Sequence, residues 1–207
     1  MLPIDILLTF ALATLLLGLA PGPDNVFVLM QSALHGAVSG LFVVFGLCTG
    51  LLFHSAAVAL GLAALIQAST LAFTVIKFAG AAYLVYLAFQ AFRAAPQDLQ
   101  NKSPSLSGWA LYRRGVIMNI TNPKVALFFL ALFPQFTDPA LGNMSGQIAV
   151  LGGVFICVTL LVFGSVALVA GGLSQRLMRA PKMQVIMNRL AGAVFIGLAA
   201  KIATSQR

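Results

Sequence analysis

Pro21-Gly22-Pro23-Asp24-Asn25 interrupts an apolar run that otherwise extends from Ile4 to Met30. Proline removes a backbone donor and clashes with the preceding helical turn, so two prolines around a glycine should open the helix. Lipid offers the freed carbonyls no partner, and such a break is tolerated only where it faces protein or a water-filled cavity. Asp24 follows the break, where helix N-terminal amides favour a negative charge. The stretch therefore predicts a broken membrane helix with a charged group at the break.

The composition of the 207-residue chain agrees with a membrane setting. The chain is 60% hydrophobic and 8% charged, against roughly 45–50% and 25% in soluble domains, and its mean hydropathy is +1.01. A soluble protein of this size must cover a large surface with polar side chains, so the composition excludes a cytosolic enzyme, a disordered chain and a disulfide scaffold. The net charge of +8 does not indicate nucleic acid, because the cations do not form one basic face with interleaved aromatic residues.

Five further apolar runs are long enough to cross a bilayer core as helices. They are expected at Ala37–Ile66, Leu71–Phe92, Leu111–Phe133, Ile148–Gly171 and Val185–Ile202. The first run has no cation before its apolar core, so it is interpreted as a retained helix and not as a signal peptide. The sequence predicts an all-α membrane protein with six transmembrane helices, of which helices one and four are broken.

A polar segment, residues 93–110, divides the chain into halves 1–92 and 111–207 within one transporter domain. With three helices in each half, the halves insert in opposite orientations, the arrangement of inverted-repeat transporters. Basic residues cluster after helix three and after helix five: Arg93, Lys102, Arg113 and Arg114, then Arg176, Arg179, Lys182 and Arg189. The positive-inside rule therefore predicts that these two segments are cytoplasmic and that both termini lie outside.

A second break, Asn119-Ile120-Thr121-Asn122-Pro123-Lys124, occupies the corresponding place in the second half. Two interrupted helices in corresponding positions indicate a transporter binding site. Asp24 suits an ammonium group and Lys124 a carboxylate, so a site with both would suit a zwitterionic amino acid. Two alternatives stay open. Asp24 and Lys124 could form an ion pair that only holds the halves together, or Lys124 could anchor the cytoplasmic end of helix four.

Two further polar residues lie inside apolar runs. His54 belongs to a stripe of small residues at helical spacing, made of Gly46, Gly50, Ala57 and Gly61. Such stripes let helices approach closely, so His54 should face a neighbouring helix, where it either relays protons or is hydrogen-bonded and inert. For Lys77, snorkelling to the outer interface is favoured over lining the path.

The common enzyme motifs HExxH, GxxxxGK[ST] and CxxC do not occur in the sequence. The prediction is a secondary transporter and not an enzyme, without a cofactor or metal site. Two other functions stay open. A metal-cation exporter needs several oxygen or thiolate ligands, and the chain has four acidic residues. A membrane thiol–disulfide electron carrier would use Cys48 and Cys157, one in each half.

Several motifs, in order along nearly the whole chain, resemble those of the LysE/RhtB family of amino-acid exporters. They are Ala20-Pro21-Gly22-Pro23-Asp24, the glycine-spaced stretch from Gly36 to His54, Lys77-Phe78-Ala79-Gly80-Ala81-Ala82-Tyr83-Leu84, Gly115 with Asn119, Asn122-Pro123-Lys124, Phe128-Phe129 and Phe133-Pro134-Gln135-Phe136. The resemblance implies a multi-pass protein of the bacterial inner (plasma) membrane. It also implies export of neutral amino acids such as threonine, homoserine and leucine, or of basic ones, driven by the proton gradient.

The partners expected from these observations are a small-molecule substrate, the proton as coupling ion and the lipid bilayer, with a homodimer left open. The residues expected along the substrate or proton path are Pro21, Gly22, Pro23, Asp24, Asn25, His54, Lys77, Asn119, Asn122, Pro123 and Lys124.

Overall fold

The computed structural model describes residues 2–19, 22–68, 70–93 and 106–172, and short helical pieces between Val185 and Thr204; within α3 and α4, the side chains of residues 62–73 and 76–77 are among those outside the description. All described elements are helical. They are α1 (Ile4–Leu19), α2 (Pro23–His35), α3 (Ala37–Ala68), α4 (Thr70–Arg93), α5 (Gly108–Ile120), α6 (Pro123–Phe136), the short 3-10 helix η1 (Pro139–Leu141) and α7 (Met144–Gly172). The expected all-α class is confirmed.

The long helices and the bent helix pairs account for four of the expected membrane spans. α3 and α7 are each long and apolar enough to cross a membrane unbroken. α1 and α2 meet at 64° and α5 and α6 at 50°, and each bent pair has the length and composition of one further span. The breaks predicted in helices one and four are therefore confirmed. α4 covers the expected third run, while Val185–Ile202 lies mostly outside the described residues, so the total of six stays a prediction.

Local hydrogen bonds explain where the helices on either side of the breaks end and begin. The side-chain Oδ1 of Asn122 accepts a hydrogen bond from the backbone N–H of Lys124 at 3.0 Å and caps α6. Prolines occupy the first positions of α2 and α6, where a missing donor costs nothing. At the first break, the Asn25 side chain donates from Nδ2 to the carbonyl of Gly18 at 2.7 Å. That bond satisfies a carbonyl that has lost its helical partner.

The start of α5 differs slightly from expectation, because the helix begins at Gly108, inside the segment assigned to the linker. The cause is Ser107, whose hydroxyl oxygen accepts a hydrogen bond from the backbone N–H of Ala110 at 3.3 Å. Serine is a favoured helix N-cap, and it sets the boundary here.

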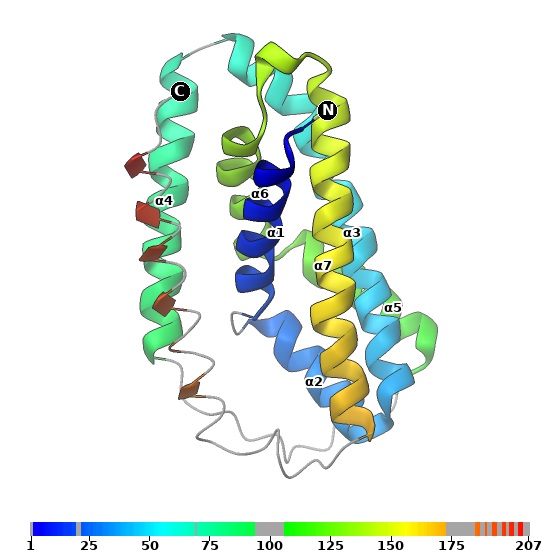
Figure 1. Ribbon diagram of the computed structural model, residues 1–207. Helices are drawn as coiled ribbons and strands as arrows, with labels where there is room; N and C mark the ends of the chain where they lie inside the picture. Colours follow the sequence, from blue (N-terminus) through cyan, green and yellow to red (C-terminus); the bar gives the residue numbers. More distant parts are fainter. Residues whose placement is uncertain are drawn as a thin grey trace.

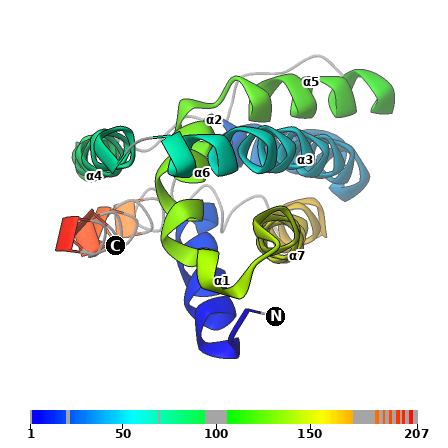
Figure 2. The same ribbon diagram turned by 90° about the horizontal axis from the view of Figure 1, so that it is seen from above.

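The helices form a bundle in which α1 and α6 lie centrally, with α4 on one flank and α5 on the other (Figures 1 and 2). α1 contacts α7, and α5 contacts α3. Each broken helix thus begins against the long helix of the other half of the chain. The ends of α1 and α5 lie near mid-height of the bundle (Figure 1). Asp24, Asn122 and Lys124, which follow these ends, are buried.

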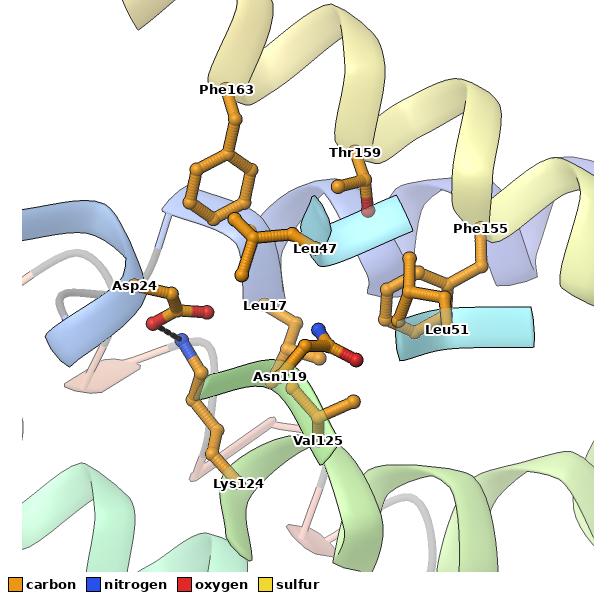
Figure 3. A pocket seen from close by; sticks show the side chains of 11 residues that line it. Leu17, Asp24, Leu47, Leu51, Asn119, Lys124, Val125, Phe155, Thr159 and Phe163 are labelled. Carbon is orange, nitrogen blue, oxygen red and sulfur yellow. Dashed lines mark ion pairs between the residues drawn. The ribbon is translucent and has the colours of Figure 1, made fainter. Parts of the chain in front are cut away.

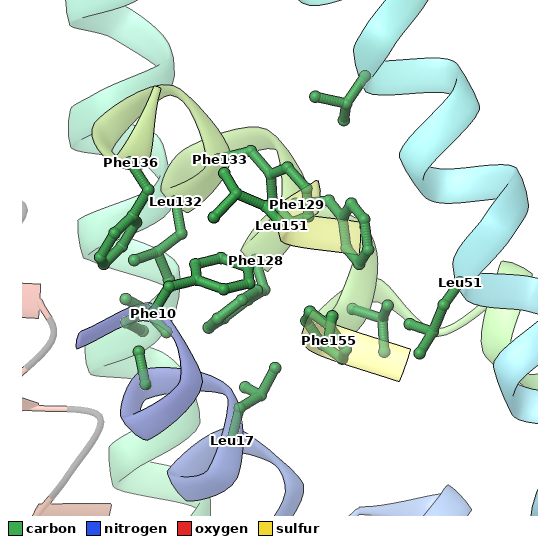
Figure 4. Packing of buried hydrophobic residues seen from close by; sticks show 14 of the residues in the cluster. Phe10, Leu17, Leu51, Phe128, Phe129, Leu132, Phe133, Phe136, Leu151 and Phe155 are labelled. Atoms are coloured by element: carbon green, nitrogen blue, oxygen red, sulfur yellow. The ribbon is translucent and has the colours of Figure 1, made fainter. Parts of the chain in front are cut away.

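Aromatic side chains fill the bundle on the side of the breaks toward the start of α1 (Figure 4). The ring centroid of Phe10 lies 5.2 Å from that of Phe133. The ring centroids of Phe128 and Phe129 of α6 lie 5.4 and 5.1 Å from that of Phe155 of α7. Because lipid tails are as apolar as these side chains, close packing rather than removal from water holds such helices together.

Glycines allow the close contact between α3 and α5. A Cβ atom on Gly46 would lie 2.1 Å from the backbone oxygen of Tyr112, and one on Gly115 would lie 2.4 Å from that of Val43. The small-residue stripe therefore does bring α3 against a neighbouring helix. Its last member, Gly61, takes no part among the described residues, where a Cβ on Gly61 would have nothing within 4 Å.

Replacing Gly46 with Ala is expected to destabilise the protein by about 1–3 kcal/mol, the usual cost of forcing extra atoms into a close contact. The thermal unfolding midpoint of the purified protein in detergent measures the effect. Gly61→Ala is the matched control and should keep or raise the midpoint, because Ala favours a helix more than Gly does. Equal midpoints for the two variants would contradict the assigned contact.

Candidate functional site

The two helix breaks bring opposite charges together inside the bundle. Asp24 lies in the first turn of α2 and Lys124 in the first turn of α6. The distance from Lys124 Nζ to Asp24 Oδ1 is 3.5 Å, and the two side chains are only 6% and 5% exposed. Figure 3 shows the pair facing each other between the interrupted helices. Lys124 therefore lies at the break with its side chain buried against Asp24, which favours the ion pair over an anchoring role for this residue.

Gly22 makes room for this ion pair. A Cβ atom at Gly22 would lie 2.6 Å from Asp24 Oδ1 and 2.9 Å from Lys124 Nζ. Its backbone is extended, with φ −161°, so the requirement for glycine comes from space and not from conformation. Pro21, the neighbouring member of the predicted path, lies outside the described residues.

A cavity of about 20 Å³ lies beside the ion pair (Figure 3). Its walls come from both breaks and from the long helices α3 and α7: Leu17, Gly18, Asp24, Leu47, Leu51, Asn119, Lys124, Val125, Phe155, Thr159 and Phe163. A volume of this size holds about one water molecule and is too small for an amino acid. A molecule the size of an amino acid would fit beside the pair only if the helices moved apart.

Buried polar atoms without hydrogen-bond partners gather at the breaks. Within the described residues, they include Oδ1 of Asn25 and Asn119 and Nδ2 of Asn122. Buried polar groups are satisfied as a rule, and each exception needs an explanation such as a ligand or a water molecule. Apolar walls with a few polar groups converging on them are typical of small-molecule sites. The breaks therefore have the chemistry of a binding site for a small polar molecule.

His54 joins α3 to the second break. Its Nε2 lies 3.2 Å from the backbone oxygen of Asn119, which also accepts the backbone N–H of Asn122 at 3.1 Å. Because a carbonyl oxygen can only accept, Nε2 carries the hydrogen. The expectation that His54 faces a neighbouring helix is confirmed, whereas a proton relay stays a prediction. The side chain of Lys77 lies outside the described part of α4.

The long helix α7 supplies a cavity wall that the sequence analysis did not anticipate. Phe155, Thr159 and Phe163 line the cavity from α7, opposite the breaks. Thr159 is only 6% exposed. A hydroxyl within an apolar helix was a signal in the sequence, but the sequence does not show which face of the helix it occupies.

The residues behind the two alternative functions are also placed by the structure. Within the described residues, no three His, Cys, Asp or Glu side chains lie together as metal ligands. Cys48 is buried, Cys157 is exposed, and both thiols are free.

The chain is similar to one family of known proteins. A family model described as LysE type translocator matches residues 15–206. An uncharacterized membrane protein of Vibrio cholerae is 38% identical over 205 residues, which cover 98% of each chain. A homoserine/homoserine lactone efflux protein of Salmonella typhimurium is 34% identical over 198 residues, which cover 95% of each chain. No solved structure matches.

Proposed function

The chain belongs to the family of LysE type translocators, and we propose that it exports a neutral, zwitterionic amino acid or a close derivative. The observation that carries the proposal is the buried ion pair between Asp24 and Lys124, formed where two interrupted helices meet. The name of the Salmonella relative, a homoserine/homoserine lactone efflux protein, supports the substrate class.

In this proposal the two charges exchange partners during transport. When substrate enters, its ammonium group binds Asp24 and its carboxylate binds Lys124. When substrate leaves, the two side chains pair with each other again, as in the structure. Burying an unpaired charge is costly, and in this scheme each charge has a partner both before and after substrate binds.

The small number of carboxylate side chains favours a neutral substrate over a basic one. The chain has only four acidic residues: Asp5, Asp24, Asp98 and Asp138. Asp5 lies in the first turn of α1 and is exposed, and Asp138 caps η1. Asp98 lies outside the described residues. Asp24 is the carboxylate that lines the cavity, and the side-chain cation of a lysine substrate would need a second one.

Transport by alternating access and driven by the proton gradient completes the proposal. The halves 1–92 and 111–207 would rock against each other and open the site first to one side and then to the other. The end of the bundle that carries Arg93 and the start of α5 (Figure 1) would be cytoplasmic, because Arg113 and Arg114 also lie there.

This orientation predicts which positions a membrane-impermeant thiol reagent reaches in intact cells. With both native cysteines replaced by Ala, a cysteine introduced at Asn143 should react from outside. One introduced at Ser107 should react only after permeabilisation. The reverse pattern would overturn the orientation.

Release of labelled amino acids from preloaded vesicles tests the function. Vesicles that contain the protein and carry an imposed proton gradient should release homoserine or threonine faster than empty vesicles. They should not release lysine faster, and a protonophore should abolish the difference. The Cys48→Ala/Cys157→Ala variant should release substrate at the wild-type rate, unless the protein is a thiol carrier. Release of lysine alone would contradict the neutral substrate, and no release of any amino acid would contradict export.

A further inference from the structure

The side chain of Asn119 ends in a buried acceptor beside the ion pair. Asn119 is 3% exposed and lines the cavity. Its Oδ1 has no hydrogen-bond partner among the described residues. A buried acceptor that is left unpaired is costly, so this oxygen is suited to a donor that arrives with the substrate.

The surroundings of Asn119 hold this amide in place. Its backbone carbonyl accepts hydrogen bonds from His54 of α3 and from the backbone of Asn122. Its side chain lies against Gly50, where an added Cβ would come within 2.6 Å of Oδ1. Hydrogen bonds therefore hold the backbone of Asn119, and packing against Gly50 limits where its side-chain amide can lie. A polar group that is held in place discriminates between ligands better than a mobile one.

The side-chain amide of Asn119 does not point toward the ion pair. In Figure 3 it points away from Asp24 and toward the side chains of Leu51 and Phe155. If Asp24 and Lys124 bind the ammonium and carboxylate groups, the substrate side chain extends into this apolar part of the wall. There Asn119 Oδ1 is a hydrogen-bond acceptor next to the apolar side chains of Leu51 and Phe155.

We propose that Asn119 is a specificity-determining residue, whose Oδ1 accepts a hydrogen bond from a hydroxyl group on the substrate side chain. The inference rests on the function proposed above for the same site. A site built to bind a substrate hydroxyl rejects the analogue that lacks it, because the buried acceptor would then remain unpaired.

Homoserine and 2-aminobutyrate test this proposal, since they differ only in the hydroxyl group. Wild-type vesicles should release homoserine faster than 2-aminobutyrate by about tenfold or more. In Asn119→Leu, which keeps the shape of the side chain, the ratio should fall to near one through loss of homoserine release. If the Asn119→Leu variant does not reach the membrane, Asn119→Ala replaces it, because the smaller side chain cannot crowd Gly50.

Ser55→Ala is the matched control. Within the described part of the chain, the buried Ser55 hydroxyl oxygen also has no hydrogen-bond partner, but Ser55 does not line the cavity. It should keep the wild-type ratio. A ratio that is unchanged in both Asn119 variants would overturn the proposal, as would equal release of the two amino acids by the wild type. Release of neither would instead overturn the proposed export function.

Discussion

Asp24→Asn is expected to lower substrate release by about 30-fold or more while the protein still inserts into the membrane. The substitution keeps the size of the side chain and removes the charge that would receive the substrate ammonium group. Removing one partner of a buried charge pair costs about 2–5 kcal/mol, and the lower figure corresponds to about 30-fold. The measurement is the initial rate of release from preloaded vesicles, divided by the amount of inserted protein.

Asp5→Asn is the matched control for this prediction. It makes the same chemical change in the first turn of α1, where the side chain is exposed. The control should release substrate at the wild-type rate. A normal rate in Asp24→Asn would remove this carboxylate from the transport mechanism.

Lys124→Met is expected to destabilise the protein, and the double variant Asp24→Asn/Lys124→Met is expected to recover stability without recovering transport. The single substitution leaves Asp24 buried without its cation, a change that typically costs about 3–5 kcal/mol. Replacing both members of a buried pair is often neutral or stabilising. Thermal unfolding in detergent and release from vesicles measure the two properties separately.

The double variant also separates the two interpretations of the ion pair that the sequence left open. If the pair only fastens the halves of the chain together, a stable double variant should transport normally. If the charges bind the substrate, the double variant should fold and remain inactive. Recovery of both properties would therefore contradict the proposed site.

The helix breaks were predictable from the sequence because their causes are local. Proline acts on its own turn of helix, so Pro23 and Pro123 mark the breaks without knowledge of any neighbour. The meeting of Asp24 with Lys124 was predictable for another reason: opposite charges at corresponding breaks have few other partners in so apolar a chain. For the first five expected runs, the helix boundaries in the structure agree to within a few residues, apart from α2, which continues to His35.

The walls of the site were not predictable, because they depend on how helices turn against each other. The sequence does not show that Thr159 of α7 faces the breaks. It also does not show that Gly22 is needed to make room for the ion pair, since that follows from a distance across two helices. The bond from Asn25 to Gly18 likewise depends on the 64° bend between α1 and α2.

Protection by substrate of a cysteine introduced by Thr159→Cys tests most directly whether substrate binds between the two breaks. The native cysteines are replaced by Ala, and a small thiol reagent is added to vesicles with and without homoserine. Ser145→Cys, at the exposed start of the same helix, is the control. Homoserine should slow the reaction severalfold in the Thr159→Cys variant and leave the Ser145→Cys variant unchanged. An equal rate with and without homoserine in the Thr159→Cys variant, in vesicles that do transport it, would contradict the site.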